Sequence, residues 1–176
     1  MNNVELERTF LAKYLPKDLK SFPSKEIIDI YLLMDTEGSK MRLRKTGNDY
    51  EITKKEMIDE KDASRQMEST IKLTKEEFEE LAKISDKKIH KIRYYYNFNE
   101  IKAEVDIFLD NLEGLVLIDF EFENENKKDL FLVPDFCLAD VTQENFIAGG
   151  RLCDKSYKEI KEELGKLNYK KITCEF

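Results

Sequence analysis

Leu-Val-Leu-Ile-Asp-Phe-Glu-Phe-Glu, residues 115–123, is the stretch that decides the fold. Apolar side chains occupy the even positions from 116 to 122, whereas the odd positions from 119 to 123 are all carboxylates. A period of two is typical of a β-strand with one apolar and one polar face. Glu5 and Glu7 repeat the arrangement near the N-terminus. Because like charges on neighbouring strands repel, two such strands predict a metal ion or basic side chains between them.

Length and composition indicate a soluble globular protein. The 176 residues suit one domain, 1–176, with a buried core, and 38% charged against 41% hydrophobic residues excludes a disordered chain. The net charge of −7 argues against general nucleic-acid binding but allows a locally basic pocket. Three cysteines without Cys-x-x-Cys spacing indicate free thiols in a reducing cytoplasm. The sequence shows neither a signal-peptide core nor an apolar run that could span a bilayer.

The remaining chain predicts an antiparallel meander with few helices. Capping boxes that begin at Thr74 and Ser156 predict two helices, the second reaching about residue 167. Polar segments predict loops at 16–26, 56–63 and 124–129, and a short helical turn fits within the first of them. Pro134 predicts a short edge strand within 130–142. Alternation between turn residues predicts strands over residues 4–11, 27–34, 40–46, 50–56, 65–72, 90–98 and 101–108.

Charged side chains are sorted by strand face. A solvated face on an open antiparallel sheet is the simpler interpretation. The density of charges of both signs, and the small number of helices, favour a curled and closed sheet with the charges inside. Such a lumen suits a highly anionic ligand together with a cation. The ionisable face comprises Glu5, Glu7, Arg42, Arg44, Lys55, Glu68, Lys91, Arg93, Glu104, Asp106, Asp119, Glu121 and Glu123.

This charge pattern indicates phosphoryl chemistry. Carboxylates at positions i and i+2 of a strand project to one side and can hold one divalent ion, and Mg²⁺ and Mn²⁺ prefer such oxygen ligands. Arg-x-Arg and Lys-x-Arg pairs supply donors that match phosphate oxygens. A polyphosphate between the two sets would be neutralised from both sides while water attacks and a phosphoryl group departs.

In the order of its motifs, the chain resembles the CYTH, or triphosphate tunnel metalloenzyme, superfamily. The Glu-x-Glu signature at residues 5–10 is followed by Arg-x-Arg at 41–45, Thr-x-Lys at 53–55, Lys-x-Arg-Tyr at 91–94, Glu-Val-Asp at 104–106, acid-x-acid at 119–121 and Asp-Val-Thr at 140–142. The resemblance covers about residues 4–152, before the helix at 156–167. It implies an α+β, mainly β, fold: an eight-stranded antiparallel closed barrel with a charged lumen and a few helices outside.

The motifs and the resemblance together assign roles to the candidate site residues, with Mg²⁺ or Mn²⁺ as cofactor and a small-molecule triphosphate as partner. Binding of nucleic acid or membrane is not expected, and a homodimer is left open. The expected catalytic residues are Glu5, Glu7, Lys91 and Arg93. The expected substrate-binding residues are Arg42, Arg44, Lys55, Lys91, Arg93 and Arg151. The expected metal ligands are Glu5, Glu7, Asp119, Glu121 and Glu123.

Three departures from the family pattern keep several functions open. Thr9 stands where the signature has a lysine, Asp119 replaces a longer glutamate, and the late Arg-Tyr is Asn145-Phe146, for which Arg151 is a substitute. The leading hypothesis is a metal-dependent hydrolase that releases phosphate from tripolyphosphate or a nucleoside triphosphate. A class IV adenylyl cyclase, which makes cyclic AMP from ATP, is the first alternative. A non-catalytic module that binds polyphosphate or nucleotide is the second, and Thr9 favours it.

Overall fold

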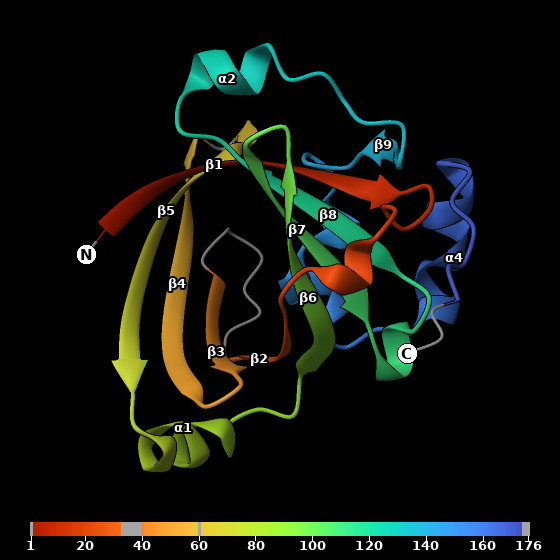
Figure 1. Cartoon of the computed structure of the whole chain (residues 1–176). Coiled ribbons are helices and arrows are strands. Elements are labelled where there is room, and N and C mark those ends of the chain that lie inside the picture. The colour runs from red at the N-terminus through yellow and green to blue at the C-terminus, as the bar shows by residue number, and fades with distance from the viewer. Residues whose placement is uncertain (1, 33–39, 60, 174–176) are drawn as a thin grey trace.

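The structure is a computed structural model that describes residues 2–32, 40–59 and 61–173. Within these residues, eight antiparallel strands close into a barrel and a ninth strand extends it, which confirms the predicted eight-stranded barrel (Figure 1). The order around the ring is β5-β4-β3-β2-β6-β7-β8-β1, and β1 pairs with β5 to close it. The strands are β1 Asn2–Ala12, β2 Ser24–Tyr31, β3 Lys40–Thr46, β4 Asp49–Asp59, β5 Asp62–Leu73, β6 Lys88–Phe98, β7 Ile101–Phe108, β8 Val116–Glu121 and β9 Cys137–Asp140.

Strand β1 closes the barrel by changing partners along its length. Its first half pairs with β5, with Glu5 opposite Gln66, and its second half pairs with β8, with Glu7 opposite Glu121. Its last residues also pair with β9. Figure 1 shows β1 crossing from β5 to the region of β8 and β9. The alternation of β1 therefore places two acids inside the ring, each against a different neighbouring strand.

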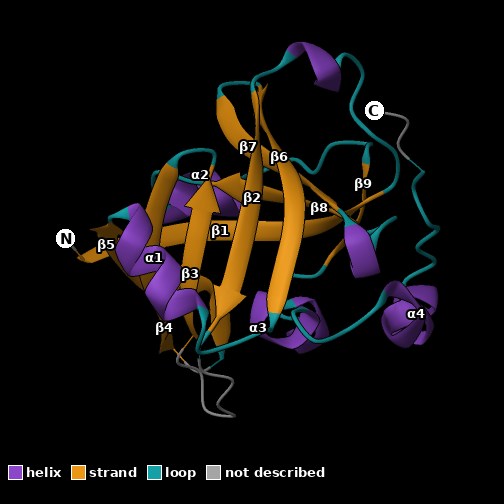
Figure 2. Cartoon of the chain, turned by 90° about the horizontal axis from the view of Figure 1, so that it is seen from below, coloured by secondary structure: helices purple, strands orange, loops and turns teal. Residues whose placement is uncertain are grey.

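The helices lie outside the barrel (Figure 2). Helix α1 (Lys75–Ala82) packs on β3, β4 and β5, and both predicted capping boxes, at Thr74 and at Ser156, are formed. No helix in the described part of the chain is long and apolar enough to cross a membrane. The other helices are α2 Glu125–Asp129, α3 Gly149–Leu152 and α4 Tyr157–Lys166, and 3-10 turns occur at Leu19–Ser21, Asp110–Leu112 and Asn145–Ile147.

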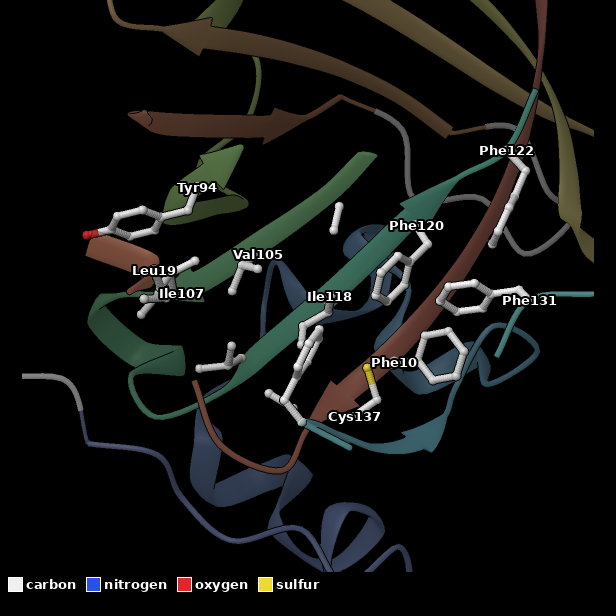
Figure 3. Close-up of a cluster of buried hydrophobic side chains, with 14 residues drawn as sticks. Phe10, Leu19, Tyr94, Val105, Ile107, Ile118, Phe120, Phe122, Phe131 and Cys137 are labelled. Atoms are coloured by element: carbon white, nitrogen blue, oxygen red, sulfur yellow. The ribbon is translucent and has the colours of Figure 1, made fainter. Parts of the chain in front are cut away.

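One of the two apolar core clusters lies on the outer side of the barrel wall, whereas residues of the second, among them Ile89, Phe108 and Leu117, also line the cavity. Figure 3 shows the rings of Phe10, Phe120 and Phe131 gathered beside β1 and β8. The rings of Phe10 and Phe120 meet edge to face with centroids 5.8 Å apart, and Phe120 and Phe131 lie 4.6 Å apart. Because Ile118 and Phe120 alternate with Asp119 and Glu121, burying the apolar residues in this core directs the acids into the lumen.

Several predicted boundaries were wrong. Residues 56–59 and 62–63 of the expected 56–63 loop lie in strands, because β4 runs to Asp59, β5 starts at Asp62 and Glu56 pairs with Met67. Charged residues fit this hairpin end since residues 56–59 are exposed. Residues 124–129 contain α2, and β2 starts inside the expected 16–26 loop, although the helical turn expected there is present. The end of the expected strand 27–34 and the turn after it lie outside the described residues.

Candidate active site

A cavity of about 1050 Å³ occupies the lumen of the barrel. Its lining comes from the inward positions of the strands together with residues of the 141–152 segment. Every candidate site residue except Glu123 lies on it. The acids of the lining are Glu5, Glu7, Asp29, Glu68, Glu104, Asp106, Asp119, Glu121 and Glu144, and the bases are Arg42, Arg44, Lys55, Lys61, Lys91, Arg93 and Arg151.

Glu123 lies outside the cavity. Strand β8 ends at Glu121, so the alternation that directs side chains into the lumen stops there. The Glu123 side chain is 80% exposed and pairs with Lys127 at 2.7 Å. The expectation that Glu123 is a metal ligand is therefore corrected, because a period of two places side chains only while the strand lasts.

Two arginines of β3 form a basic surface around a buried acid. Asp29 on β2 is 1% exposed, and the Nε and Nη2 atoms of Arg44 donate to its two oxygens at 2.7 and 2.8 Å. Arg42 lies 3.9 Å from Asp29. Burial alone would raise the pKa of Asp29, but Arg44 and Arg42 outweigh burial and hold that pKa well below its usual range. The buried Nε of Arg42 has no hydrogen-bond partner among the described residues, so it can donate to a ligand.

Lys55 of β4 extends this basic surface, and we call Arg42, Arg44 and Lys55 the cationic wall. Its Nζ lies 2.5 Å from Glu5 and 3.4 Å from Glu68. Burial would lower the pKa of Lys55, but Glu7 and Glu5 more than offset burial and raise it, so the side chain remains cationic. Thr70 donates to Glu68 at 3.0 Å, which fixes the second carboxylate beside the lysine.

A second cationic pair surrounds Asp106 of β7. Arg93 donates to both oxygens of Asp106 at 2.6 Å, and Lys91 also bonds to this carboxylate. Asp106 is 1% exposed, and although burial acts to raise its pKa, Arg93 and Lys91 lower it to about 2. Arg93 further contacts Glu104 and lies 3.7 Å from Asp119. Burial, followed by the charge of Arg93, lowers the pKa of Lys91, whereas Asp106 opposes the fall. The hydrogen bonds to Asp106 hold the pair in place before any substrate arrives.

Four acids on β1 and β8, namely Glu5, Glu7, Asp119 and Glu121, form what we call the carboxylate wall. Glu7 faces Glu121 directly across the two strands, which places like charges opposite one another. Burial, followed by the charges of Glu7 and Asp106, raises the pKa of Asp119 to about 7. Burial likewise raises the pKa of Glu5 and of Glu121. Burial is thus the main cause of each rise, and the neighbouring acids of the lumen add to it.

Thr9 and Arg8 show how the altered signature is accommodated. The hydroxyl of Thr9 donates to Asp119 at 2.7 Å, so a neutral donor stands where the family pattern has a cation. Arg8 points away from the lumen, as its odd spacing from Glu5 and Glu7 predicts, and pairs with Asp140 at 2.7 Å. No neighbouring cation on β1 replaces the missing lysine.

The carboxylate wall fits a hard divalent cation by its chemistry. No three His, Cys, Asp or Glu side chains in the described ranges are already gathered as a metal-binding cluster. The donors are nevertheless all carboxylate oxygens on adjacent strands, and Glu7 lies directly opposite Glu121, so a cation between the strands would offset their repulsion. Glu5, Glu7, Asp119 and Glu121 are therefore the residues that would hold such an ion.

Sequence reasoning missed several residues of the lining. Asp29 was not assigned to the site, although an acid within the apolar stretch at 27–34 was a usable signal. Gln143 and Glu144 follow β9 outside any periodic pattern, so nothing in the sequence marked them. Gly149 approaches Tyr31 so closely that an added Cβ would lie 1.9 Å from the tyrosine hydroxyl oxygen, so a larger residue there would require the Tyr31 side chain to move.

Comparison with known proteins agrees with this geometry. The chain is 30% identical over 143 residues to an inorganic triphosphatase of Nitrosomonas europaea, covering 80% of this chain and 90% of that protein. It is 36% identical over 74 residues to an inorganic triphosphatase of Acetivibrio thermocellus, of which those residues span 46%. A crystal structure of an inorganic triphosphatase superimposes with a TM-score of 0.63 at 25% identity, over 85% of this chain and 93% of that one. No protein-family model matches.

The closed antiparallel barrel with acids and bases converging in its lumen defines a member of the CYTH, or triphosphate tunnel, superfamily. Within it, the chain belongs to the inorganic triphosphatase family, because its similarity to the Nitrosomonas europaea relative extends over nearly the whole of both proteins.

Proposed function

We propose that this chain is a divalent-metal-dependent hydrolase that cleaves the phosphoanhydride bond of a triphosphate and releases phosphate. The observation that supports it most is the pairing of the cationic wall with the carboxylate wall around one cavity of about 1050 Å³. Strands β3 and β8 lie four places apart in the ring of eight, which is the greatest separation the barrel allows. A triphosphate between β3 and β8 meets arginine donors on one side and carboxylate oxygens on the other, and the two walls meet where Lys55 bonds to Glu5 at 2.5 Å.

The cationic wall and the Lys91–Arg93 pair bind and orient the substrate. Arg42 and Arg44 present guanidinium donors, and the buried Arg42 Nε has no hydrogen-bond partner within residues 2–32, 40–59 and 61–173. Asp29 and Asp106 hold these side chains in position, so little ordering is required when phosphate oxygens arrive. The same cations neutralise the negative charge that develops on the leaving pyrophosphate.

The carboxylate wall serves the attacking water. A bound Mg²⁺ or Mn²⁺ ion would neutralise substrate charge and lower the pKa of water. Glu7 makes no hydrogen bond or ion pair with other described residues, so its carboxylate is able to accept the proton that water loses. The water oxygen bonds to the terminal phosphorus, the bond from that phosphorus to the bridging oxygen breaks, and phosphate and pyrophosphate result.

A phosphate-release assay tests this proposal. The purified chain is incubated with tripolyphosphate, ATP or thiamine triphosphate, each with Mg²⁺ or Mn²⁺. Free phosphate is the expected product. Cyclic AMP with pyrophosphate from ATP would instead show the cyclase, and tight binding without any product would show the non-catalytic module.

Removing divalent cations is expected to abolish hydrolysis without unfolding the barrel. EDTA removes the cation from the carboxylate wall. The repulsion between Glu7 and Glu121 then persists, and no cation neutralises the substrate phosphates that face these acids. Added Mg²⁺ or Mn²⁺ should restore phosphate release, while circular dichroism stays unchanged throughout. Full activity in the chelator would contradict the assignment of the carboxylate wall as the metal site.

Replacing Thr9 with lysine is expected to raise turnover several-fold. The change puts an ammonium group next to Asp119, where Thr9 now offers only a hydroxyl, and adds positive charge beside the phosphates. Steady-state kcat for tripolyphosphate is the measurement. Thr9→Val is the matched control, since it removes the hydroxyl without adding charge and should not increase kcat.

The compartment and the assembly belong to the same proposal. We place the protein in the cytoplasm, and the buried free thiol of Cys137 supports a reducing compartment. A homodimer stays a prediction, which the mass of the native protein in solution would test.

A further inference from the structure

The Tyr94-Tyr95-Tyr96 run of β6 divides into two packing tyrosines and one exposed tyrosine. Tyr94 is 8% exposed within the core, and Tyr96 packs its ring on Phe22 with centroids 4.7 Å apart. Tyr95 is 38% exposed, and no other ring in the described chain packs on it. The run as a whole is therefore not explained by core packing.

Strand parity places Tyr95 on the lumen side of β6, one step beyond the residues that line the cavity. It follows Lys91 and Arg93 at the same period of two, and both of those side chains line the cavity. It pairs across the sheet with Glu104 of β7, which also lines the cavity. Two strand residues span about 7 Å, so the ring lies about that distance beyond Arg93 along β6.

The electrostatic surroundings of Tyr95 agree with this placement. Partial burial raises the pKa of its hydroxyl, Arg93 opposes the rise, and Glu104 and Arg44 also act on it. Arg93 and Arg44 belong to the two groups of cations assigned to phosphate binding. The exposed ring of Tyr95 beside these cations could stack on a planar aromatic group that is covalently attached to the bound phosphates.

We propose that Tyr95 is a specificity-determining residue, which stacks on the nucleobase of a nucleoside triphosphate whose phosphates occupy the lumen. This inference rests on the proposed triphosphate binding and adds an organic group to it. Inorganic tripolyphosphate has no such group and does not use Tyr95. The side chain thus sets the preference between the two kinds of substrate.

Binding of two non-hydrolysable probes separates these contributions. Isothermal titration with Mg²⁺ compares β,γ-methylene ATP with the bis-methylene analogue of tripolyphosphate. Tyr95→Ala should weaken binding of the ATP analogue about 5- to 100-fold, as loss of one stacked base does. Binding of the tripolyphosphate analogue should change less than about twofold. Tyr95→Phe should preserve both affinities because the ring remains, and Tyr14→Ala, the control, removes a similarly exposed tyrosine that does not belong to β6.

Each other result overturns the inference. Equal weakening for both probes would show that Tyr95 acts through Arg93 or the barrel wall, and unchanged binding of the ATP analogue would show that the ring touches no base. If the wild-type chain binds the tripolyphosphate analogue but not the ATP analogue, the role of Tyr95 fails while the triphosphatase proposal stands. If it binds neither probe, the proposed function itself fails.

Discussion

Replacing Glu121 with glutamine is expected to lower kcat for tripolyphosphate about 100-fold or more while the barrel stays folded. The neutral amide keeps the size of the side chain but removes one charged oxygen donor from the carboxylate wall, and a bound cation stabilises the transition state by several kcal/mol. The free energy of unfolding should not fall. Glu121 faces Glu7 and burial raises its pKa, so the ionised Glu121 side chain destabilises the folded state.

Glu123→Gln is the matched control for this variant. The two residues are both glutamates in one short stretch, but Glu123 lies outside the cavity and pairs only with a surface lysine. Its replacement should leave kcat unchanged, whereas Glu5→Gln should reduce kcat as Glu121→Gln does. Kinetics at saturating Mg²⁺ together with thermal melting distinguish lost chemistry from lost structure. Unchanged kcat in both Glu5→Gln and Glu121→Gln would refute the proposed metal site.

The contrast between Glu121 and Glu123 also shows how far sequence reasoning extends. Alternation predicted the inward face of β8 correctly as far as Glu121, because the apolar partners Ile118 and Phe120 must enter the core. It failed two residues later, because the point at which a strand ends depends on pairing with β1 and on the path toward α2, which no local pattern encodes. The lumen was predicted because each strand sorts its charged and apolar side chains onto opposite faces. The order of the charged motifs along the chain then indicated the closed barrel.

Residues that depend on long-range contacts were harder to predict. Asp29 becomes the centre of the cationic wall only because β2 pairs with β3 and brings Arg44 opposite it. Gln143 and Glu144 reach the cavity through the chain that follows β9, and a single sequence without periodicity gives no such placement. The strand ends at 56–59 and 62–63 were mistaken for a loop because their charged residues obscure the alternation. Residues 56–59 are all exposed, so no buried face marks the strand there.

Replacing Asp29 with asparagine is expected to destabilise the fold by about 3–5 kcal/mol, the usual effect of removing one partner from a buried ion pair. The buried carboxylate bonds to Arg44 and lies beside Arg42, so the neutral amide leaves Arg44 without its counter-charge and removes one of the two acids beside Arg42, the other being Glu68 at 4.0 Å. Urea unfolding measures the loss. Glu26→Gln on the same strand removes an acid whose partner is surface His90, and should cost about 1 kcal/mol or less. Equal effects of the two variants would contradict the structural role of Asp29.

The pH dependence of stability gives an independent test of the same pair. The pKa of Asp29 is lowered in the folded state, so its contribution is fully present above the unfolded pKa of about 3.9 and is lost as the pH falls below that value. The difference in unfolding free energy between wild type and Asp29→Asn should therefore be constant near neutral pH and shrink in acid. Adding Arg44→Met to Asp29→Asn should recover part of the loss, because an apolar replacement removes the stranded charge. A double variant no more stable than Asp29→Asn alone would mean that the loss arises from packing around β2 and β3 rather than from unpaired charge.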